Sequence, residues 1–142
     1  MENKYDVLKL ENQLCFPLYA AAKEIVNSYR PFLNEIGLTY TQYITMMVLW
    51  EHKECSIKEI GERLMLDSGT LTPVLKSLEN KGYVIRSRCQ HDERIVTVKL
   101  TDKGEKLKET AVEIPSKVAR CISLSADEAK TLYELLYKIL DR

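Results

Sequence analysis

The chain has 142 residues, of which 45% are hydrophobic and 30% charged, and 21 basic side chains balance 21 acidic ones. This length suits one domain with a substantial core, and the composition excludes intrinsic disorder, while five glycines and four prolines favour helices over long loops. A net charge of zero excludes a polycation that holds nucleic acid by bulk charge alone.

The sequence lacks signals for membranes, secretion or bound metals. No apolar run approaches the ~18 residues that a membrane-spanning helix needs, and the charged N-terminal segment does not resemble a secretory signal. Cysteines stand at positions 15, 55, 89 and 121, without the spacing of a zinc site or a disulfide framework. We therefore expect a cytoplasmic protein with free thiols, no metal, no cofactor and no membrane partner.

The first part of the chain is predicted to be helical. Apolar residues recur at helical spacing over residues 8–29, which predicts one long helix. Pro17 requires this helix either to begin near residues 13–16 or to be kinked, and Pro31 is expected to break it. A second amphipathic helix is expected after a cap at residues 39–42.

Two short helices with a tight turn between them are predicted next. Residues 56–59 form a capping box before the first of them. The second is expected to end at Gly82, in a left-handed cap. Pro73 fits into its first turn if the helix begins near residues 69–70, whereas a start at Ser68 would cost one hydrogen bond. The pattern is that of a helix-turn-helix.

A β-hairpin is the one clear strand signal in the sequence. Residues 83–89 and 95–100 are rich in β-branched side chains and flank a polar tip. A further helix is expected from Thr101 towards Pro115, and a last one after the capping box at Ser125. The predicted fold class is therefore mainly α with a small β-hairpin, a winged helix-turn-helix flanked by N- and C-terminal helices.

This order of elements suits a division of labour on double-stranded DNA. The start of the second helix can enter the major groove, while the hairpin tip reaches the backbone or the minor groove. Asp92 is expected to orient Arg94. Taken singly, such residues are most often helix caps or a solvated face, but together and in this order they indicate DNA as the partner. The candidate DNA-binding residues are Ser68, Thr70, Thr72, Lys76, Arg86, Arg88, Asp92 and Arg94.

The sequence resembles the MarR family of winged-helix transcription regulators, most strongly over residues 38–108. The motifs that carry the resemblance are residues 60–64, 67–73, 78–84, 92–94 and 100–104. The resemblance implies a homodimer that binds a pseudo-palindromic operator and represses transcription. Residues 1–142 would then be a single MarR-type domain, with residues 38–108 as the DNA-binding lobe and residues 8–35 and 109–142 as dimerisation helices.

Cys15 is the candidate for the regulatory input. A cysteine on an apolar helical face is most often a small buried hydrophobe. However, residues 14–19 and 38–43, with Tyr29, resemble the OhrR branch of the MarR family, whose members sense organic hydroperoxides. The resemblance implies that Cys15 is the peroxide-reactive thiol and that Tyr29 and Tyr40 donate hydrogen bonds to it across the dimer interface. Such donors stabilise the thiolate, which is the nucleophile that attacks a peroxide and becomes a sulfenic acid.

A second thiol would decide the fate of that sulfenic acid. The position of Cys121 resembles the resolving cysteine of two-cysteine OhrR proteins, which implies an intersubunit disulfide with Cys15. One-cysteine members of this branch form mixed disulfides with small thiols instead. Cys55 and Cys89 have no such match and are expected to be structural or incidental.

Two other functions are compatible with the sequence. The chain could be a MarR regulator that a small phenolic ligand releases from DNA, or a thiol peroxidase that uses Cys15 catalytically. The peroxidase hypothesis gives the DNA-binding pattern no purpose, so a regulator that is not an enzyme is favoured. The charge distribution agrees, because residues 53–108 carry 12 basic and 9 acidic side chains, a net charge of +3, while the segments before and after them carry −2 and −1.

Overall fold

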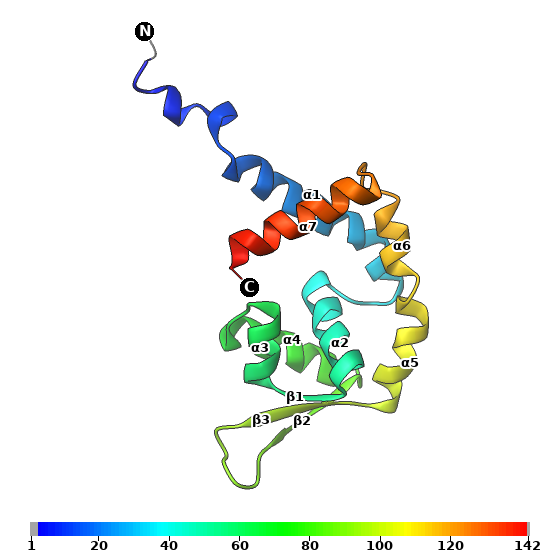
Figure 1. Cartoon of the computed structure of the whole chain (residues 1–142). Helices are drawn as coiled ribbons and strands as arrows, with labels where there is room; N and C mark the ends of the chain where they lie inside the picture. Colours follow the sequence, from blue (N-terminus) through cyan, green and yellow to red (C-terminus); the bar gives the residue numbers. More distant parts are fainter. Residues whose placement is uncertain (1–2, 142) are drawn as a thin grey trace.

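The computed structural model describes residues 3–141 and packs helices on a small antiparallel sheet (Figure 1). Residues 1, 2 and 142 of the predicted single domain lie outside this description. The short 3₁₀ helices η1 (Asp6–Leu8) and η2 (Leu10–Asn12) come first. The elements that follow are α1 (Cys15–Glu35), α2 (Tyr40–His52), β1 (Glu54–Ser56), α3 (Ile57–Leu64), α4 (Ser68–Asn80), β2 (Val84–Arg88), β3 (Val96–Leu100), α5 (Asp102–Ala111), α6 (Ile114–Ala119) and α7 (Ala126–Leu140).

Helix α1 begins later and ends later than the sequence pattern predicts. Of the two alternatives that Pro17 left open, the later start is confirmed, because α1 begins at Cys15, after the two 3₁₀ helices. Pro17 is its third residue, where a missing N–H costs no bond within the helix. The break predicted at Pro31 was wrong, since α1 continues to Glu35. Packing in the next turn compensates for the bond lost at this proline, because Leu33 is only 2% exposed.

Helix α4 begins at Ser68, which corrects the later start that Pro73 had suggested. The carboxylate of Asp67 caps the helix and accepts the Thr70 N–H at 2.7 Å. Pro73 is then the sixth residue, and the Gly69 carbonyl loses its usual helical donor. Three fully buried leucines hold the helix against the core and offset this loss: Leu71, Leu75 and Leu78.

The predicted hairpin is confirmed as β2 and β3, which pair with Arg86 opposite Val98. A third strand, β1, was not predicted. It pairs antiparallel with β3, with Cys55 opposite Val98, so that β3 lies in the middle of the sheet. Three residues are too few to show an alternating pattern. Lys53, which has a left-handed φ of 64°, turns the chain from α2 into this strand.

The predicted helix starts at Thr39, Ser56 and Ser125 are confirmed. Each side chain accepts the backbone N–H three residues later, and the Gln or Glu at that position bonds back. Gly82 follows α4 in the expected left-handed conformation, with φ of 83°. The helix predicted to run towards Pro115 is divided into α5 and a short α6 that contains this proline.

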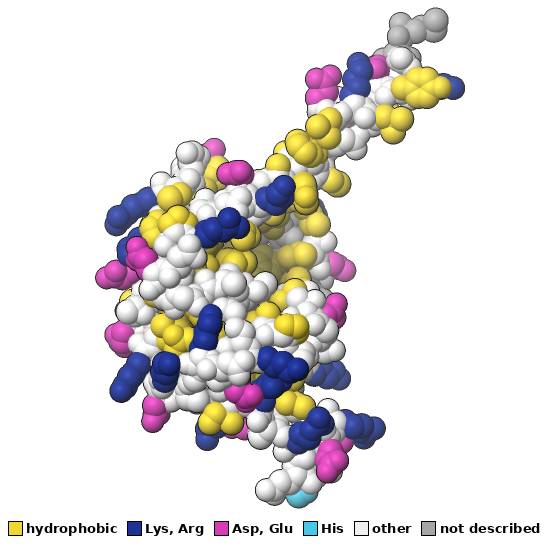
Figure 2. All heavy atoms as spheres, turned by 180° about the vertical axis from the view of Figure 1, so that it is seen from behind, with side chains coloured by type: hydrophobic (Ala, Val, Ile, Leu, Met, Phe, Trp, Pro, Cys, Tyr) yellow, Lys and Arg dark blue, Asp and Glu magenta, His cyan; other side chains and the backbone are white. Residues whose placement is uncertain are grey.

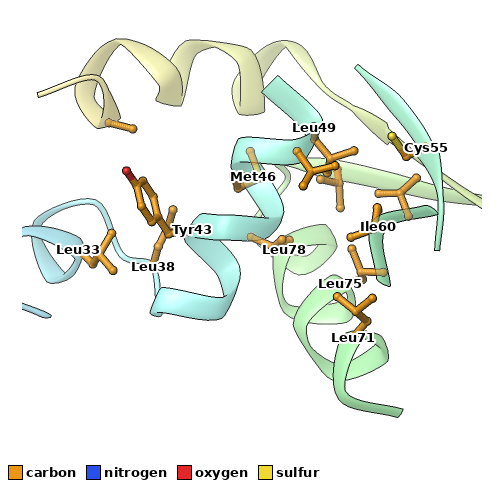
Figure 3. Close-up of a cluster of buried hydrophobic side chains, with 14 of the residues drawn as sticks. Leu33, Leu38, Tyr43, Met46, Leu49, Cys55, Ile60, Leu71, Leu75 and Leu78 are labelled. Atoms are coloured by element: carbon orange, nitrogen blue, oxygen red, sulfur yellow. The ribbon is translucent and has the colours of Figure 1, made fainter. Parts of the chain in front are cut away.

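The core runs from the C-terminal half of α1 through α2 to α4. Figure 3 shows Leu33 and Leu38 at one end of this row, Tyr43 and Met46 in the middle, and the leucines of α4 beyond them. By contrast, α7 and the two 3₁₀ helices bury no residue. Across residues 3–141, no helix is long and apolar enough to cross a membrane.

Candidate DNA-binding and redox sites

The backbone of α3 lies close to the turn that leads into α4, and this contact fixes the angle between the two helices. After α3 ends, Met65 adopts a left-handed backbone with φ of 57°. The Leu66 N–H donates to the Gly61 carbonyl at 2.9 Å. A Cβ added to Gly61 would lie 2.6 Å from the Leu66 carbonyl oxygen. Only glycine fits at this position, so α4 leaves the turn in a fixed direction.

The first turns of α4 present the predicted DNA-binding residues to solvent. Ser68, Thr70 and Lys76 are exposed, and Thr72 is half-buried. The Thr72 hydroxyl donates to the Ser68 carbonyl at 2.7 Å. Ser68, Thr72 and Lys76 follow an i, i+4 spacing and therefore share one face of the helix. Hydroxyl and ammonium groups are the kinds of group that contact base edges and phosphates.

The hairpin of β2 and β3 is the wing, and the loop that joins the two strands projects from the sheet (Figure 1). This loop carries Arg94. Its guanidinium donates to both carboxylate oxygens of Asp92, each at 3.0 Å. The side-chain hydrogen bond from Arg94, followed by its backbone N–H, lowers the pKa of Asp92. Because the Arg94 side chain is 91% exposed, the pair orients this charge without burying it. Nearby, Arg88 donates to the Glu93 carbonyl at 2.8 Å.

A groove brings the helix and the wing together. It lies between α3, the start of α4 and the wing, and its lining includes Ser68, Thr72 and Arg94. Figure 2 shows Lys and Arg side chains across the lower half of the molecule, around the projecting wing. Thr70 and Lys76 lie outside the groove lining, on the exposed surface of α4. A polyanion such as DNA would meet hydroxyl groups and cations together on this face.

Arg86 is bonded to α4. Its backbone N–H donates to Glu79 Oε2 at 2.7 Å, and its Nη2 donates to Oε1 at 3.2 Å. The backbone N–H of Arg86, followed by its side chain, holds the pKa of Glu79 below its ordinary value. The pair ties β2 to α4, while a contact of Arg86 with DNA stays a prediction. Glu79 was missed in the sequence, because no local pattern signals a bond from a helix to the next strand.

The predicted thiolate-stabilising pair, Tyr29 and Tyr40, is brought together by α1 and α2, with ring centroids 5.0 Å apart. Tyr43 is a third member that the sequence did not indicate, 5.6 Å from the Tyr29 ring and 6.4 Å from the Tyr40 ring. Burial raises the pKa of Tyr29 and of Tyr40. Burial and the two neighbouring phenols raise the pKa of Tyr43 to about 12. All three phenols therefore keep their protons at neutral pH and can donate hydrogen bonds.

The predicted sensor and resolving cysteines are both exposed. Cys15 is the first residue of α1, and Leu14 before it makes no side-chain capping bond, so the first N–H groups of the helix have no side-chain cap. Cys121 follows α6, and its sulfur lies 3.6 Å from the Lys117 carbonyl oxygen.

The other two cysteines have different surroundings. Cys55 is buried in the core, where burial raises the pKa of its thiol. Cys89 is half-buried at the base of the wing, and its backbone N–H donates to the Ile95 carbonyl at 2.8 Å. In the part of the chain that is described, no group of three or more His, Cys, Asp or Glu side chains could hold a metal ion.

Comparison with known proteins identifies the family. The sequence profile described as transcriptional regulator SarA/Rot matches residues 27–111. The organic hydroperoxide resistance transcriptional regulator of Bacillus subtilis (strain 168) is 47% identical over 141 residues, which cover 99% of this chain and 96% of that relative. The chain belongs to the MarR family of winged-helix transcription regulators. Within this family it is similar to regulators of the SarA/Rot and OhrR types. The SarZ regulator of Staphylococcus epidermidis is 41% identical over 142 residues, covering 100% of this MarR-family chain and 93% of SarZ.

Solved structures of the MarR-type regulator AbfR add information about redox states. Reduced AbfR bound to DNA matches with a TM-score of 0.80 at 37% identity, covering 98% of this chain and 97% of that one. The disulfide form of AbfR matches with a TM-score of 0.65 at 36% identity, covering 97% and 94%. The fold of this chain is thus closer to the reduced, DNA-bound form of that relative than to its disulfide form.

Proposed function

We propose that this MarR-family chain is a DNA-binding repressor that senses organic hydroperoxides by oxidation of Cys15 and then releases its operator. One observation carries the proposal: an exposed cysteine begins a helix whose first turns expose apolar side chains, in a chain with a complete helix-turn-helix and wing. The similarity to the Bacillus hydroperoxide resistance regulator supports the class of oxidant.

A second copy of the chain would cover the exposed apolar side chains of the N-terminal segment and α7. Figure 2 shows such side chains along the arm that projects from the body and in the hollow beside it. Monomeric proteins rarely expose a contiguous apolar surface of this extent. We therefore assign residues 8–35 and 109–142 to a homodimer interface and residues 38–108 to DNA binding. The exposed apolar residues include Leu10, Leu14, Phe16, Tyr19, Leu132, Leu135, Ile139 and Leu140.

Helix geometry favours a sensor site that is shared between two protomers. Tyr29 lies 14 residues after Cys15 on α1, which at about 1.5 Å per residue is a separation of about 21 Å. The cluster of Tyr29, Tyr40 and Tyr43 in one chain is therefore out of reach of the Cys15 of that chain. In the proposed dimer, Tyr29 and Tyr40 donate to the thiolate of the partner's Cys15.

The proposed chemistry is a two-electron oxidation of the thiol. The Cys15 thiolate attacks the O–O bond of the hydroperoxide, which breaks as an S–O bond forms. The rest of the peroxide takes a proton and leaves as an alcohol, while the sulfur becomes a sulfenic acid. The exposed Phe16 and Leu18 beside the thiol favour organic hydroperoxides over hydrogen peroxide.

The same geometry favours Cys121 as a resolving thiol for the partner chain rather than for its own. Lys117, one turn before Cys121, has its Nζ 5.9 Å from the ring centroid of Phe32, so this segment lies near the C-terminal end of α1. Phe32 is 17 residues after Cys15, a separation of about 25 Å along the helix. A disulfide needs Cα atoms within about 7 Å. Cys121 would therefore condense with the sulfenic acid of the partner's Cys15 and release water.

Intact mass and non-reducing electrophoresis after one equivalent of cumene hydroperoxide test this proposal. We expect a covalent dimer of two 16.4-kDa chains, joined by disulfides between Cys15 and Cys121. The Cys121→Ser variant should instead stop at a sulfenic acid or at a mixed disulfide with an added small thiol, and Cys89→Ser should behave as the wild type. A covalent dimer in the Cys15→Ser variant would refute the pairing. Continued peroxide consumption over many equivalents with a thiol reductant would indicate a peroxidase instead.

An Arg94→Ala variant is expected to bind the operator about tenfold more weakly and with a shallower salt dependence, because it loses the cation at the wing tip. Fluorescence anisotropy of a labelled duplex at several salt concentrations measures both quantities. Lys106→Ala is the matched control, since it removes one positive charge from an exposed position on α5, outside the predicted DNA contacts and the proposed dimer interface. Equal losses in both variants would contradict a specific wing contact.

A further inference from the structure

Gln42 is a buried polar residue that links α2 to α4. It lies in the first turn of α2 and is only 7% exposed, yet both ends of its amide are bonded. Its Nε2 donates to the Ser77 hydroxyl at 3.0 Å. Its Oε1 accepts the Thr39 N–H at 3.1 Å and the Lys81 ammonium at 3.1 Å. One side chain thus joins the start of α2 to the C-terminal end of α4.

The same turn of α2 carries two members of the tyrosine cluster. Tyr40 is the first residue of α2 and Tyr43 is the fourth. Figure 3 shows Tyr43 beside Leu38 in the packed core, next to the loop from α1. Tyr29 of α1 packs against Tyr40, with ring centroids 5.0 Å apart. Because interiors are close-packed, a displacement of either ring must be passed on to the first turn of α2.

Helix α4 connects this turn to the DNA-binding face. Ser77 lies near its C-terminal end, while Ser68 and Thr72 line the groove at its N-terminal end. The leucines that pack α4 into the core are apolar, and apolar contacts are not directional. Hydrogen bonds fix both distance and direction, so the Gln42 amide holds the orientation of α4 relative to the first turn of α2.

We propose that Gln42 is a positioning residue that couples the redox site to α4. The inference rests on the proposed function, because it requires the affinity for DNA to depend on oxidation. In the reduced protein the amide keeps α4 in its DNA-binding orientation. When oxidation displaces the tyrosines, the first turn of α2 moves, and Gln42 carries Ser77 and Lys81 with it. Two distant sites are thereby joined through one element that both of them bias.

Two variants at this position separate the bonds from the packing. Gln42→Glu has nearly the same shape and can keep every contact, since a carboxylate can accept from the Ser77 hydroxyl, the Lys81 ammonium and the Thr39 N–H. Gln42→Leu has a similar volume but loses all of these bonds. Ser77→Ala is a milder variant that removes a single bond and leaves the packing of α2 intact.

The test measures the Kd for an operator duplex in the reduced protein and after one equivalent of cumene hydroperoxide. The coupling is the Kd after oxidation divided by the Kd of the reduced protein. We expect Gln42→Glu to keep the wild-type ratio, Gln42→Leu to lower it about tenfold and Ser77→Ala to lower it about threefold. The rate at which Cys15 is oxidised should be unchanged in each variant, because Gln42 does not belong to the peroxide site.

A merely structural role would change stability without changing the ratio. A wild-type ratio in Gln42→Leu, or in Ser77→Ala if the leucine variant does not fold, overturns the inference. Equal ratios near one in every protein, including the wild type, overturn the proposed function itself. If both Gln42→Leu and Ser77→Ala lower the ratio, their double variant should lower it no further than Gln42→Leu alone, since the two side chains form one bond.

Discussion

A Cys15→Ser variant is expected to bind its operator in the reduced state and to keep it after organic hydroperoxide, whereas the wild type loses about 100-fold in affinity. The serine hydroxyl preserves the shape of the side chain but is not a thiolate nucleophile. Gel shift or fluorescence anisotropy before and after one equivalent of cumene hydroperoxide measures both states. Cys89→Ser, which removes a half-buried thiol on the wing, is the matched control. Full release of the Cys15→Ser variant by peroxide would show that another group senses the oxidant.

A Gly104→Ala variant is expected to lose about 3 kcal/mol of unfolding free energy. The added Cβ would lie 2.3 Å from the Tyr83 carbonyl oxygen and 2.7 Å from the Leu100 Cδ1. The backbone cannot easily move aside, because Trp50 Nε1 donates to the Gly104 carbonyl at 2.9 Å. Helix α5 would have to shift away from the sheet, at the junction between the DNA-binding lobe and the C-terminal helices.

Gly69→Ala serves as the control for this prediction. Gly69 lies in the first turn of α4, and the nearest atom to an added Cβ is the Asp67 Oδ1 at 3.4 Å. Alanine favours a helix, so stability should stay equal or rise slightly. Urea unfolding followed by the fluorescence of Trp50, at one fixed protein concentration, compares the variants. A Gly104→Ala midpoint equal to that of the wild type would contradict the close packing at Tyr83.

The helix starts could be predicted because their signals are local. A capping box at Thr39, Ser56 or Ser125 depends on two residues that are three positions apart, and the structure confirms each of them. The hairpin also follows from adjacent β-branched segments. Strand β1 could not be predicted, because it exists only by pairing with β3, more than forty residues later.

Pro31 and Pro73 show how packing can override the rule that proline breaks a helix. A proline inside a helix costs about 3 kcal/mol, whereas full burial of a leucine contributes about 2 kcal/mol. Helix α4 buries Leu71, Leu75 and Leu78 completely, so it tolerates Pro73. Helix α1 likewise continues past Pro31 to seat Leu33 in the core. Sequence periodicity does not reveal which side chains a distant element will cover.

The candidate site residues could be predicted by type, but their partners could not. The pairing of Asp92 with Arg94 spans two positions and was expected from the sequence. The bonds of Gln42 to Ser77 and of Glu79 to Arg86 join different elements, the first across 35 positions, so only the folded chain brings them together. The tyrosine cluster gains Tyr43 for the same reason.

The central claim is that reversible oxidation of one thiol controls the affinity of this regulator for DNA. The most direct test is the anisotropy of a labelled duplex that the reduced protein has selected from a random-sequence library. The account predicts that the anisotropy falls after one equivalent of organic hydroperoxide and recovers after dithiothreitol. An anisotropy that stays constant through both additions would contradict it.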